Sequence, residues 1–285
     1  MLTCATGTVL SRSRALADAK FRLRVLRADL GNFGPVHHRY VDGFVISAKN
    51  SGSHWLKYML SLALAEQFGL AAPAFTSGKS ADAIVGRANR ARSGRPYPQI
   101  ATSHTIPSIL LAYLPLGWVL REPPIVVLVR DIPEALRSHY RKWRDLYNLP
   151  FAEFLQGDLA GKRFMADPWW YVHFFNRWGL MQRRHPNRIL IVHYEDLLAD
   201  TEAWLRRVAA HLRLDFDDKA IDTAVAGARK DLMRDRQDPN AGETIVPYED
   251  TPAPVLSPSD QQIVRDILHG RLRYRLGYAS SMALP

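Results

Sequence analysis

The sequence lacks the features that define several large classes of protein. Cys4 is the single cysteine among 285 residues, which excludes an intramolecular disulfide framework and any cysteine-rich zinc or iron–sulfur site. The longest apolar stretch, residues 106–120, contains two prolines and is shorter than the roughly 20 residues that a membrane-spanning helix needs. The first residues lack the basic start and following apolar core of a secretory signal. These absences predict a soluble, cytoplasmic protein.

Common nucleotide-binding and catalytic motifs are missing as well. A Walker A loop requires Gly-x-x-x-x-Gly-Lys-Ser/Thr, but Ser47 occupies the place of the first glycine and Ser53 follows Gly52 where the lysine belongs. No Gly-x-Gly-x-x-Gly, Gly-x-Ser-x-Gly or His-Glu-x-x-His pattern occurs. The histidines have no metal-ligand spacing. An ATP-using kinase-like transferase is therefore disfavoured, and we predict no metal site.

Positive charge is in excess. Lys and Arg number 38 and Asp and Glu 28, which gives a net charge of +10 at pH 7, while 47% apolar residues exclude a mainly disordered chain. A nucleic acid, an anionic membrane, or a phosphate- or sulfate-bearing substrate would each suit this charge. No nucleic-acid-binding motif accompanies it, so we predict no nucleic-acid partner.

Short apolar runs alternate with helical patterns along the whole chain, which predicts one α/β domain with a parallel sheet. The predicted strands are residues 41–48, 100–104, 124–129 and 189–193. We also predict a surface insertion at 74–98, a helix at 201–212, a long loop at 234–258 and a closing basic helix at 259–276.

A further helix is predicted at residues 12–30, where apolar residues recur at helical spacing among six basic and two acidic residues. The apolar positions are Leu16, Ala19, Leu23, Leu26 and Leu30. They either pack on the domain or lie on an anionic membrane surface. We therefore divide the chain into a basic amphipathic helical extension, residues 1–40, and an α/β domain, residues 41–285.

Two strand ends have the chemistry of a phosphate site. The strand at 41–48 is followed by a short polar loop and an apolar helix, an arrangement that offers backbone N–H groups and a helix N-terminus to an anion. Arg130 ends the strand at 124–129, where ligands of open α/β sheets bind, and a guanidinium pairs with phosphate in bidentate geometry. Ser138, two helical turns later, can donate to the same group.

Five segments in order resemble the family of sulfotransferases that use 3′-phosphoadenosine 5′-phosphosulfate (PAPS). They are FVISAKNSGSHWLKYML, ATSHTIPSILLAYLP, VVLVRDIPEALRSHYRKW, ILIVHYEDLLADTEAWLRRVAAHL and LSPSDQQIVRDILHGRLRYRLGY, and they span residues 44–278. The resemblance implies a P-loop-like three-layer α/β fold with a central parallel sheet flanked by helices. It also implies sulfuryl transfer from PAPS to an acceptor hydroxyl or amine, with release of 3′-phosphoadenosine 5′-phosphate (PAP) and no metal.

The resemblance assigns residues to both phosphates of PAPS. The loop and helix start that match the 5′-phosphosulfate loop are Ser51, Gly52, Ser53, His54 and Trp55, with Trp55 stacking on adenine. Arg130 and Ser138 match the 3′-phosphate segment, and Tyr194 begins the Tyr-Glu-Asp-Leu match. Arg234 is the nearest match to the family's C-terminal Arg-Lys-Gly, which also binds the 3′-phosphate.

His104 falls in the segment that resembles Lys-Thr-His-Leu-Pro, and we assign it as the general base that takes the acceptor's proton. The family's loop has Lys or Arg before Ser-Gly, whereas this sequence has Asn50 there and Lys49 one residue earlier. Losing that charge costs several kcal/mol of barrier. Three alternatives could replace that charge. Lys49 could reach the leaving oxygen, Asn50 could donate a neutral hydrogen bond to it, or Lys57 or another basic side chain could take the place of the loop lysine. We favour Lys49.

The acceptor is less clearly marked. The apolar residues 106–120 follow His104, and Trp169, Trp170 and Tyr171 form an aromatic run. Both favour a lipid, a glycolipid or another bulky apolar alcohol, or they are core residues. A lipid acceptor fits peripheral contact with the anionic inner face of the membrane. The alternative to an enzyme is a non-catalytic module that binds nucleotides or anionic glycans, which the departure at Asn50 favours. The sequence predicts no oligomeric state.

Overall fold

A computed structural model describes residues 3–33, 36, 40–86, 96–113, 123–240 and 252–278. Its sheet consists of β1 (Gly43–Ser47), β2 (Ile100–Ser103), β3 (Ile125–Val129) and β4 (Ile189–His193). The strand order is β2-β1-β3-β4, and all three pairings are parallel. The four predicted strands and the predicted parallel α/β fold are confirmed.

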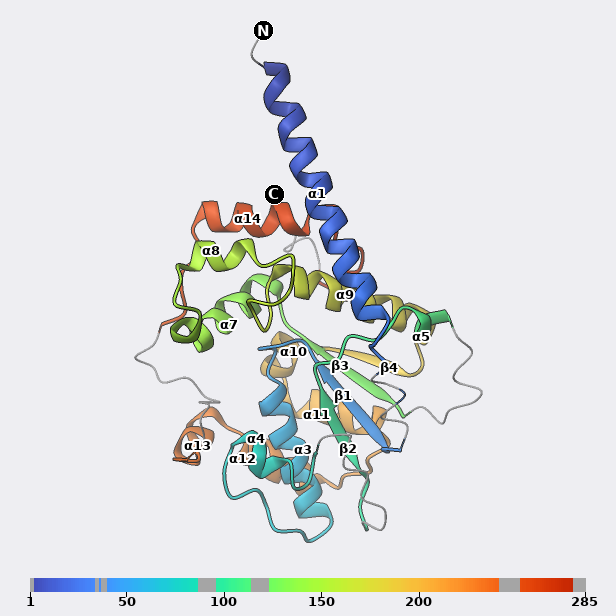
Figure 1. Ribbon diagram of the computed structural model, residues 1–285. Helices are drawn as coiled ribbons and strands as arrows, with labels where there is room; N and C mark the ends of the chain where they lie inside the picture. The colour runs from blue at the N-terminus through green and yellow to red at the C-terminus, as the bar shows by residue number, and fades with distance from the viewer. Residues whose placement is uncertain are drawn as a thin grey trace.

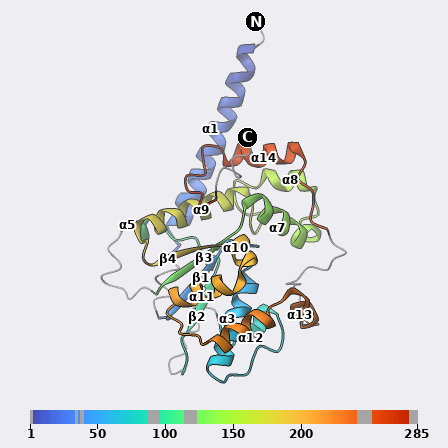
Figure 2. The ribbon, with the colours of Figure 1, turned by 180° about the vertical axis from the view of Figure 1, so that it is seen from behind.

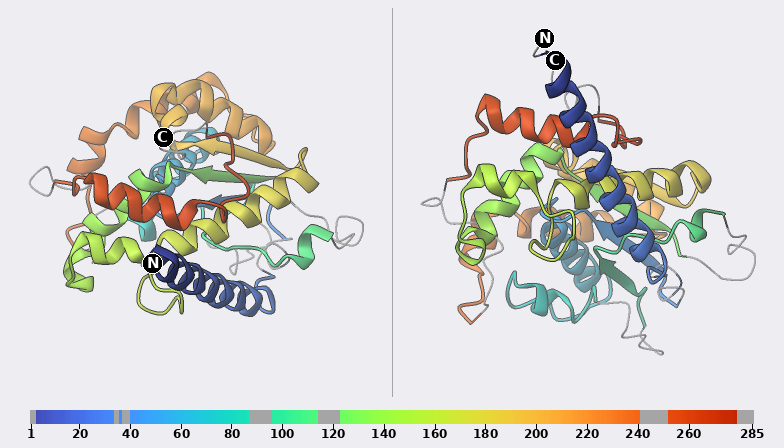
Figure 3. Two further views of the ribbon diagram at one scale, coloured as in Figure 1. Left: turned by 90° about the horizontal axis from the view of Figure 1, so that it is seen from above. Right: turned by 45° about the horizontal axis from the view of Figure 1, so that its top comes forward.

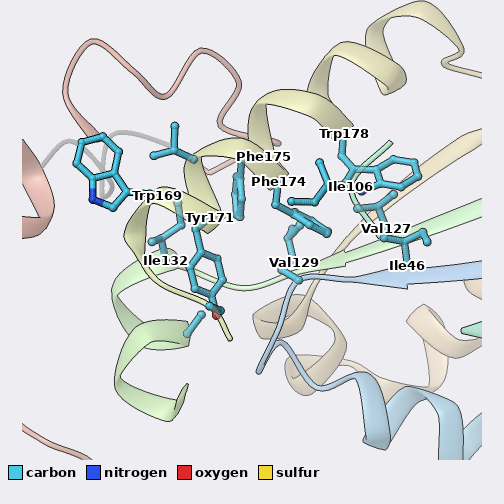
Figure 4. Packing of buried hydrophobic residues seen from close by; sticks show 14 of the residues in the cluster. Ile46, Ile106, Val127, Val129, Ile132, Trp169, Tyr171, Phe174, Phe175 and Trp178 are labelled. Atoms are coloured by element: carbon cyan, nitrogen blue, oxygen red, sulfur yellow. The ribbon is translucent and has the colours of Figure 1, made fainter. Parts of the chain in front are cut away.

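Both faces of the sheet are buried, which is why its strands read as unbroken apolar runs. Successive residues of a strand alternate between the two faces, so Ile46 packs in one core and Val45 in the other. Figure 4 shows the aromatic side chains of α9 (Pro168–Arg184) lying over Ile46, Val127 and Val129.

Helices cover each face (Figures 1 and 2). One face packs against α3 (Ser53–Gln67), α11 (Thr201–His211) and α12 (Asp218–Gly227). The other packs against α7 (Ile132–Tyr147), α8 (Phe151–Gln156), α9 and α14 (Pro258–Leu268). Shorter helices are α4 (Gly78–Ala81), α5 (Leu110–Tyr113), α10 (Tyr194–Ala199) and α13 (Lys230–Asp235). The result is the predicted three-layer arrangement.

The strand order creates a switch point between β1 and β3. The chain leaves β1 through α3 toward β2 on one side, and leaves β3 through α7, α8 and α9 toward β4 on the other. The loops that follow β1 and β3 therefore diverge at the carboxyl edge of the sheet. Open α/β sheets bind their ligands in the crevice that such a divergence leaves.

The first helix, α1 (Thr3–Asp29), packs on the domain through a different face from the one its leucines define. Ala17 and Phe21 contact the core, whereas Leu16 and Leu23 are exposed. Figures 1 and 3 show α1 running along the outside of the layer that contains α9 and α14, with its N-terminal part extending beyond the body. The helix thus packs on the domain, as one of the two alternatives predicted, but not through the leucines at 16 and 23.

Three predicted boundaries also differ from the structure. The insertion at 74–98 contributes buried Ile84 and Val85 to the core, and residues 87–95 lie outside the described residues. The loop predicted at 234–258 begins later because α13 extends to Asp235, and residues 241–251 also lie outside the description. The last helix ends at Leu268, where Gly270 takes a φ of 72°. None of the described helices is long and apolar enough to cross a bilayer.

Candidate active site

The loop after β1 presents an uncapped helix N-terminus at the switch point. Gly52 precedes α3 with a φ of 88°, and no side chain of the described residues caps the first N–H groups of the helix. A Cβ at Gly52 would lie 2.7 Å from Tyr194 Cδ2, so glycine is required on both grounds. The Ser51 hydroxyl is buried and has no hydrogen-bond partner in the part of the chain that the structure describes. Open amides beside an unpaired hydroxyl fit a bound phosphate.

Asn50 is held by a histidine that sequence reasoning had set aside. Its backbone is left-handed, with a φ of 57°, a conformation that asparagine tolerates. The Asn50 Oδ1 lies 2.7 Å from His139 Nδ1, and His139 Nε2 lies 2.8 Å from the Tyr147 hydroxyl. Burial lowers the pKa of His139 to about 3, with further contributions from nearby cations. The ring is therefore neutral, so Nδ1–H donates to Asn50 and Nε2 accepts from Tyr147.

This chain of hydrogen bonds determines what Asn50 can offer. Because its oxygen is occupied by His139, the amide nitrogen is the group left for a ligand, and among the described residues this nitrogen has no hydrogen-bond partner. Tyr147 is itself held, since its hydroxyl accepts from the Met165 N–H at 3.2 Å. Asn50 therefore presents two neutral N–H donors from a fixed position at the loop.

Lys49 is held in place by internal contacts. Its Nζ donates to the Met165 carbonyl at 2.7 Å and lies 5.7 Å from the centre of the Trp170 ring. Its own carbonyl accepts from the Tyr171 hydroxyl at 2.7 Å, and Figure 4 shows Tyr171 among the aromatic residues of α9. Burial lowers the pKa of Lys49. Lys57 forms an ion pair with Asp82, and its replacement of the loop lysine stays a prediction.

His104 follows β2, next to the end of β1. Its Nδ1 lies 2.8 Å from the Ser47 carbonyl oxygen and 3.2 Å from Ser47 Oγ. A carbonyl only accepts, so Nδ1 carries the proton and Nε2 keeps its lone pair. Desolvation by the surrounding protein lowers the pKa of His104. The hydrogen bond to the Ser47 carbonyl raises this pKa, and the positive charge of Lys49 lowers it further. A neutral, solvent-accessible imidazole with a defined tautomer is suited to accept a proton near pH 7.

Cations gather after β3. The Arg130 guanidinium lies 4.6 Å from the centre of the Tyr194 ring and 3.8 Å from Glu134. Its Nε has no hydrogen-bond partner within the described ranges. Arg141, one turn beyond half-buried Ser138 on α7, has a pKa lowered by burial and by Arg130 and Arg137. The sequence analysis missed Arg141, although its spacing of three residues after Ser138 was a usable signal.

The remaining predicted site residues are distributed over two regions. Trp55 packs edge-on to Tyr194, with ring centres 6.0 Å apart, and its indole N–H donates to the Ala228 carbonyl. Ser53 and His54 begin α3. Arg234 lies on α13, whose Met233 carbonyl accepts from Thr76. The structure thus brings Gly52, Trp55, Arg130 and Tyr194 together around one tyrosine ring, and the role of Arg234 stays a prediction.

A parallel α/β sheet with an open anion loop at its switch point defines the class of nucleotide-binding P-loop-like domains. The family model described as the sulfotransferase domain matches residues 41–250, more than half of the chain. The chain therefore belongs to the sulfotransferase domain family. The predicted sulfotransferase family and the predicted fold class are confirmed.

Two solved structures are similar to this chain. The mouse sulfotransferase SULT7A1, complexed with PAP, is 16% identical, with a TM-score of 0.54 over 88% of this chain and 89% of that chain. A retinol dehydratase in complex with retinol and PAP is 17% identical, with a TM-score of 0.48 over 81% of this chain and 82% of that one. At 16% identity, the likeness to the mouse sulfotransferase shows the fold alone.

Proposed function

We propose that this protein transfers the sulfuryl group of PAPS to the hydroxyl of an apolar acceptor, with His104 as the general base. The observation that carries the proposal is the bond from His104 Nδ1 to the Ser47 carbonyl. It directs the basic nitrogen of the imidazole away from the strand that leads into the anion loop. A proton acceptor with a defined tautomer therefore stands beside a loop suited to phosphate.

The described residues divide naturally between the two phosphates of the donor. The amides of residues 51–55 and the unpaired Ser51 hydroxyl suit the 5′-phosphate, at the positive end of α3. Arg130 and Ser138 suit the 3′-phosphate. Trp55 and Tyr194 offer apolar surface to the adenine of PAPS. PAPS supplies a sulfuryl group already activated by its bond to phosphate.

In the proposed reaction, His104 Nε2 accepts the acceptor's hydroxyl proton as the acceptor oxygen bonds to sulfur. The bond from sulfur to the bridging phosphate oxygen breaks, and its electron pair remains on that oxygen. The loop amides and the Asn50 amide nitrogen donate to the developing charge. We propose Asn50 rather than Lys49 for this contact, because the Met165 carbonyl anchors the Lys49 ammonium, whereas the bond to His139 fixes the Asn50 side chain with its N–H donors unused.

We propose a lipid-like acceptor for the same site. Leu110 and Tyr113 of α5, and Ile109 just before it, are exposed only a few residues after His104. Exposed apolar side chains near the general base favour an acceptor that brings its own apolar surface. We also propose a cytoplasmic location with peripheral membrane contact. A lipid alcohol is presented at a membrane surface, so an enzyme that acts on it must reach that surface.

Ligand-induced thermal stabilisation and turnover together test the proposal. PAP should raise the melting temperature, and ADP or ATP with magnesium should not. With ³⁵S-labelled PAPS, wild-type protein should label a lipid extract, while His104→Ala should bind PAP and label nothing. Preference for ATP would overturn the proposal in favour of a kinase-like enzyme. Stabilisation by PAP without turnover on lipids, phenols or amines would indicate a non-catalytic binding module, and reaction of a small phenol alone would remove the lipid acceptor.

A further inference from the structure

The outward face of α1 carries an exposed line of leucines. Leu16, Leu23, Leu26 and Leu30 are 57%, 46%, 58% and 75% exposed. Residues 16, 23 and 30 are seven apart, and residue 26 is three after residue 23, so all four share one stripe of the helix. We name these four residues the leucine stripe.

The opposite face of α1 attaches the helix firmly to the domain. Its contacts are Asp18 with Arg271, Phe21 with Trp169, Arg24 with the Asp158 carbonyl, and Asp29 with Arg177. The Asp29–Arg177 pair is almost fully buried, with an N···O distance of 2.8 Å. The leucine stripe is therefore exposed on a docked helix, not on a helix that lacks its proper contacts.

The charges of α1 are sorted between the same two faces. Its two acidic residues, Asp18 and Asp29, both face the domain and are paired there. The outward side chains Lys20, Arg22 and Arg27 are exposed. At 100° per residue, Lys20 and Arg27 border one side of the leucine stripe and Arg22 the other. Within residues 14–30, the outward surface thus holds leucines and cations with no acidic side chain.

This pattern matches an anionic bilayer. Leucines enter the boundary between headgroups and acyl chains, while flanking lysine and arginine side chains extend to the lipid phosphates. A second copy of α1 fits less well, because pairing two leucine stripes would bring Lys20, Arg22 and Arg27 against cations of the same sign. We propose that the leucine stripe and these three cations form a docking surface for an anionic lipid membrane.

The position of the stripe connects docking to the proposed reaction, on whose lipid acceptor this step rests. Leu30 lies at the end of α1, and Asp29 Oδ1 accepts from the Ile109 N–H at 3.0 Å. Ile109 leads into α5, whose Leu110 and Tyr113 are also exposed. Docking through α1 would therefore bring α5, in the segment that follows His104, toward the same membrane.

Co-sedimentation of the full chain with vesicles tests the surface. Vesicles of phosphatidylcholine with 30% phosphatidylserine should bind the protein on the order of 100-fold more tightly than phosphatidylcholine alone, for three cations near the surface. Leu23→Gln/Leu26→Gln should weaken this binding roughly tenfold or more. The matched control, Leu146→Gln/Val255→Gln, replaces exposed apolar residues outside the stripe and should bind like wild type. Lys20→Glu/Arg22→Glu/Arg27→Glu should lose the preference for anionic vesicles.

Equal binding to neutral and anionic vesicles, or unchanged binding of Leu23→Gln/Leu26→Gln, would overturn the proposal. A concentration-dependent dimer that this variant abolishes, without vesicle binding by wild type, would instead assign the stripe to self-association. Stabilisation by PAP and turnover of a soluble phenol should be equal in all variants, which verifies their folding. If the wild-type protein binds anionic vesicles but sulfates no acceptor, the docking surface is supported and the proposed function is refuted.

Discussion

The two ends of the proposed donor site differ in how their polar and charged side chains are held. At the reacting end, the Lys49 ammonium is bonded to Met165, His139 is neutral, and Asn50 offers uncharged donors. At the other end, Arg130 keeps an unpaired Nε and perturbs the pKa of Arg141. Two arginines therefore lie where a phosphate is to be held, whereas side chains held in a defined orientation by other residues surround the place where bonds change.

This difference separates binding from catalysis. Charge-assisted hydrogen bonds are the stronger kind and supply affinity at a phosphate that does not react. Groups that act on the reacting atoms gain more from fixed orientation, because donors already in place need no rearrangement as charge develops. Substitutions at the two ends should consequently affect different kinetic constants.

His104→Ala should have the largest effect, a loss of about 10²- to 10⁴-fold in kcat, as expected for removal of a general base. Because the pKa of His104 is lowered from 6.5, the base stays neutral in mildly acidic solution, and the acid limb of the kcat/KM profile should lie below pH 6.5. A pH–rate series checks this. Full activity of His104→Ala, or an acid limb at higher pH, would remove the histidine from its role.

Asn50→Ala should lower kcat by about 10²- to 10³-fold, the cost of removing one donor to a developing oxyanion, with little change in PAP affinity. Lys49→Met is the matched variant, and it should lower kcat less than tenfold because the ammonium is bonded to Met165. Steady-state kinetics of both variants provides the test. The reverse order of effects would restore Lys49 as the donor.

Arg130→Ala should weaken PAP binding by about 100-fold, since a charge-assisted hydrogen bond contributes about 1.5–3 kcal/mol. Arg141→Ala should weaken PAP binding about tenfold, because Arg141 lies near Arg130 and adds one positive charge close to the proposed phosphate position. Titration calorimetry with PAP measures both, and kcat at saturating PAPS should change little. A purely kcat effect at Arg130 would break the proposed separation of the two ends.

A separate effect concerns stability. The pKa of His139 is lowered to about 3, so below pH 6.5 the unfolded chain binds a proton that the folded chain does not. The free energy of unfolding should fall by up to about 1.4 kcal/mol per pH unit from this group as the pH drops from 6.5 toward 3. In His139→Gln this slope should become shallower in urea titrations.

His173→Gln is the control for that experiment. His173 is buried on α9, and its pKa is also lowered to about 3. Both variants should reduce the pH dependence of stability, but only His139→Gln should also reduce kcat, because His139 holds Asn50. Equal kcat in the two variants would show that the bond to Asn50 has no catalytic consequence.

Much of the framework was predictable from local patterns. The runs at β1 and β3 were apolar enough to require burial on both faces, and Arg130 and the polar loop at 49–54 necessarily follow them. Contacts between distant residues were not predictable. Asn50 and His139 are 89 positions apart, and no spacing rule pairs them.

The sequence by itself determined the α/β class, the order of its strands along the chain, the family, and the loops that carry the candidate site, because each depends on residues close together in the chain. Only the tertiary structure decided which nitrogen of His104 is basic, which end of Asn50 is available and which face of α1 is exposed. Each of these depends on a partner from another element: Ser47, His139 and the helices beneath α1. Helical periodicity shows that the leucines of α1 share a face, but packing against other elements decides which face of the helix contacts the core.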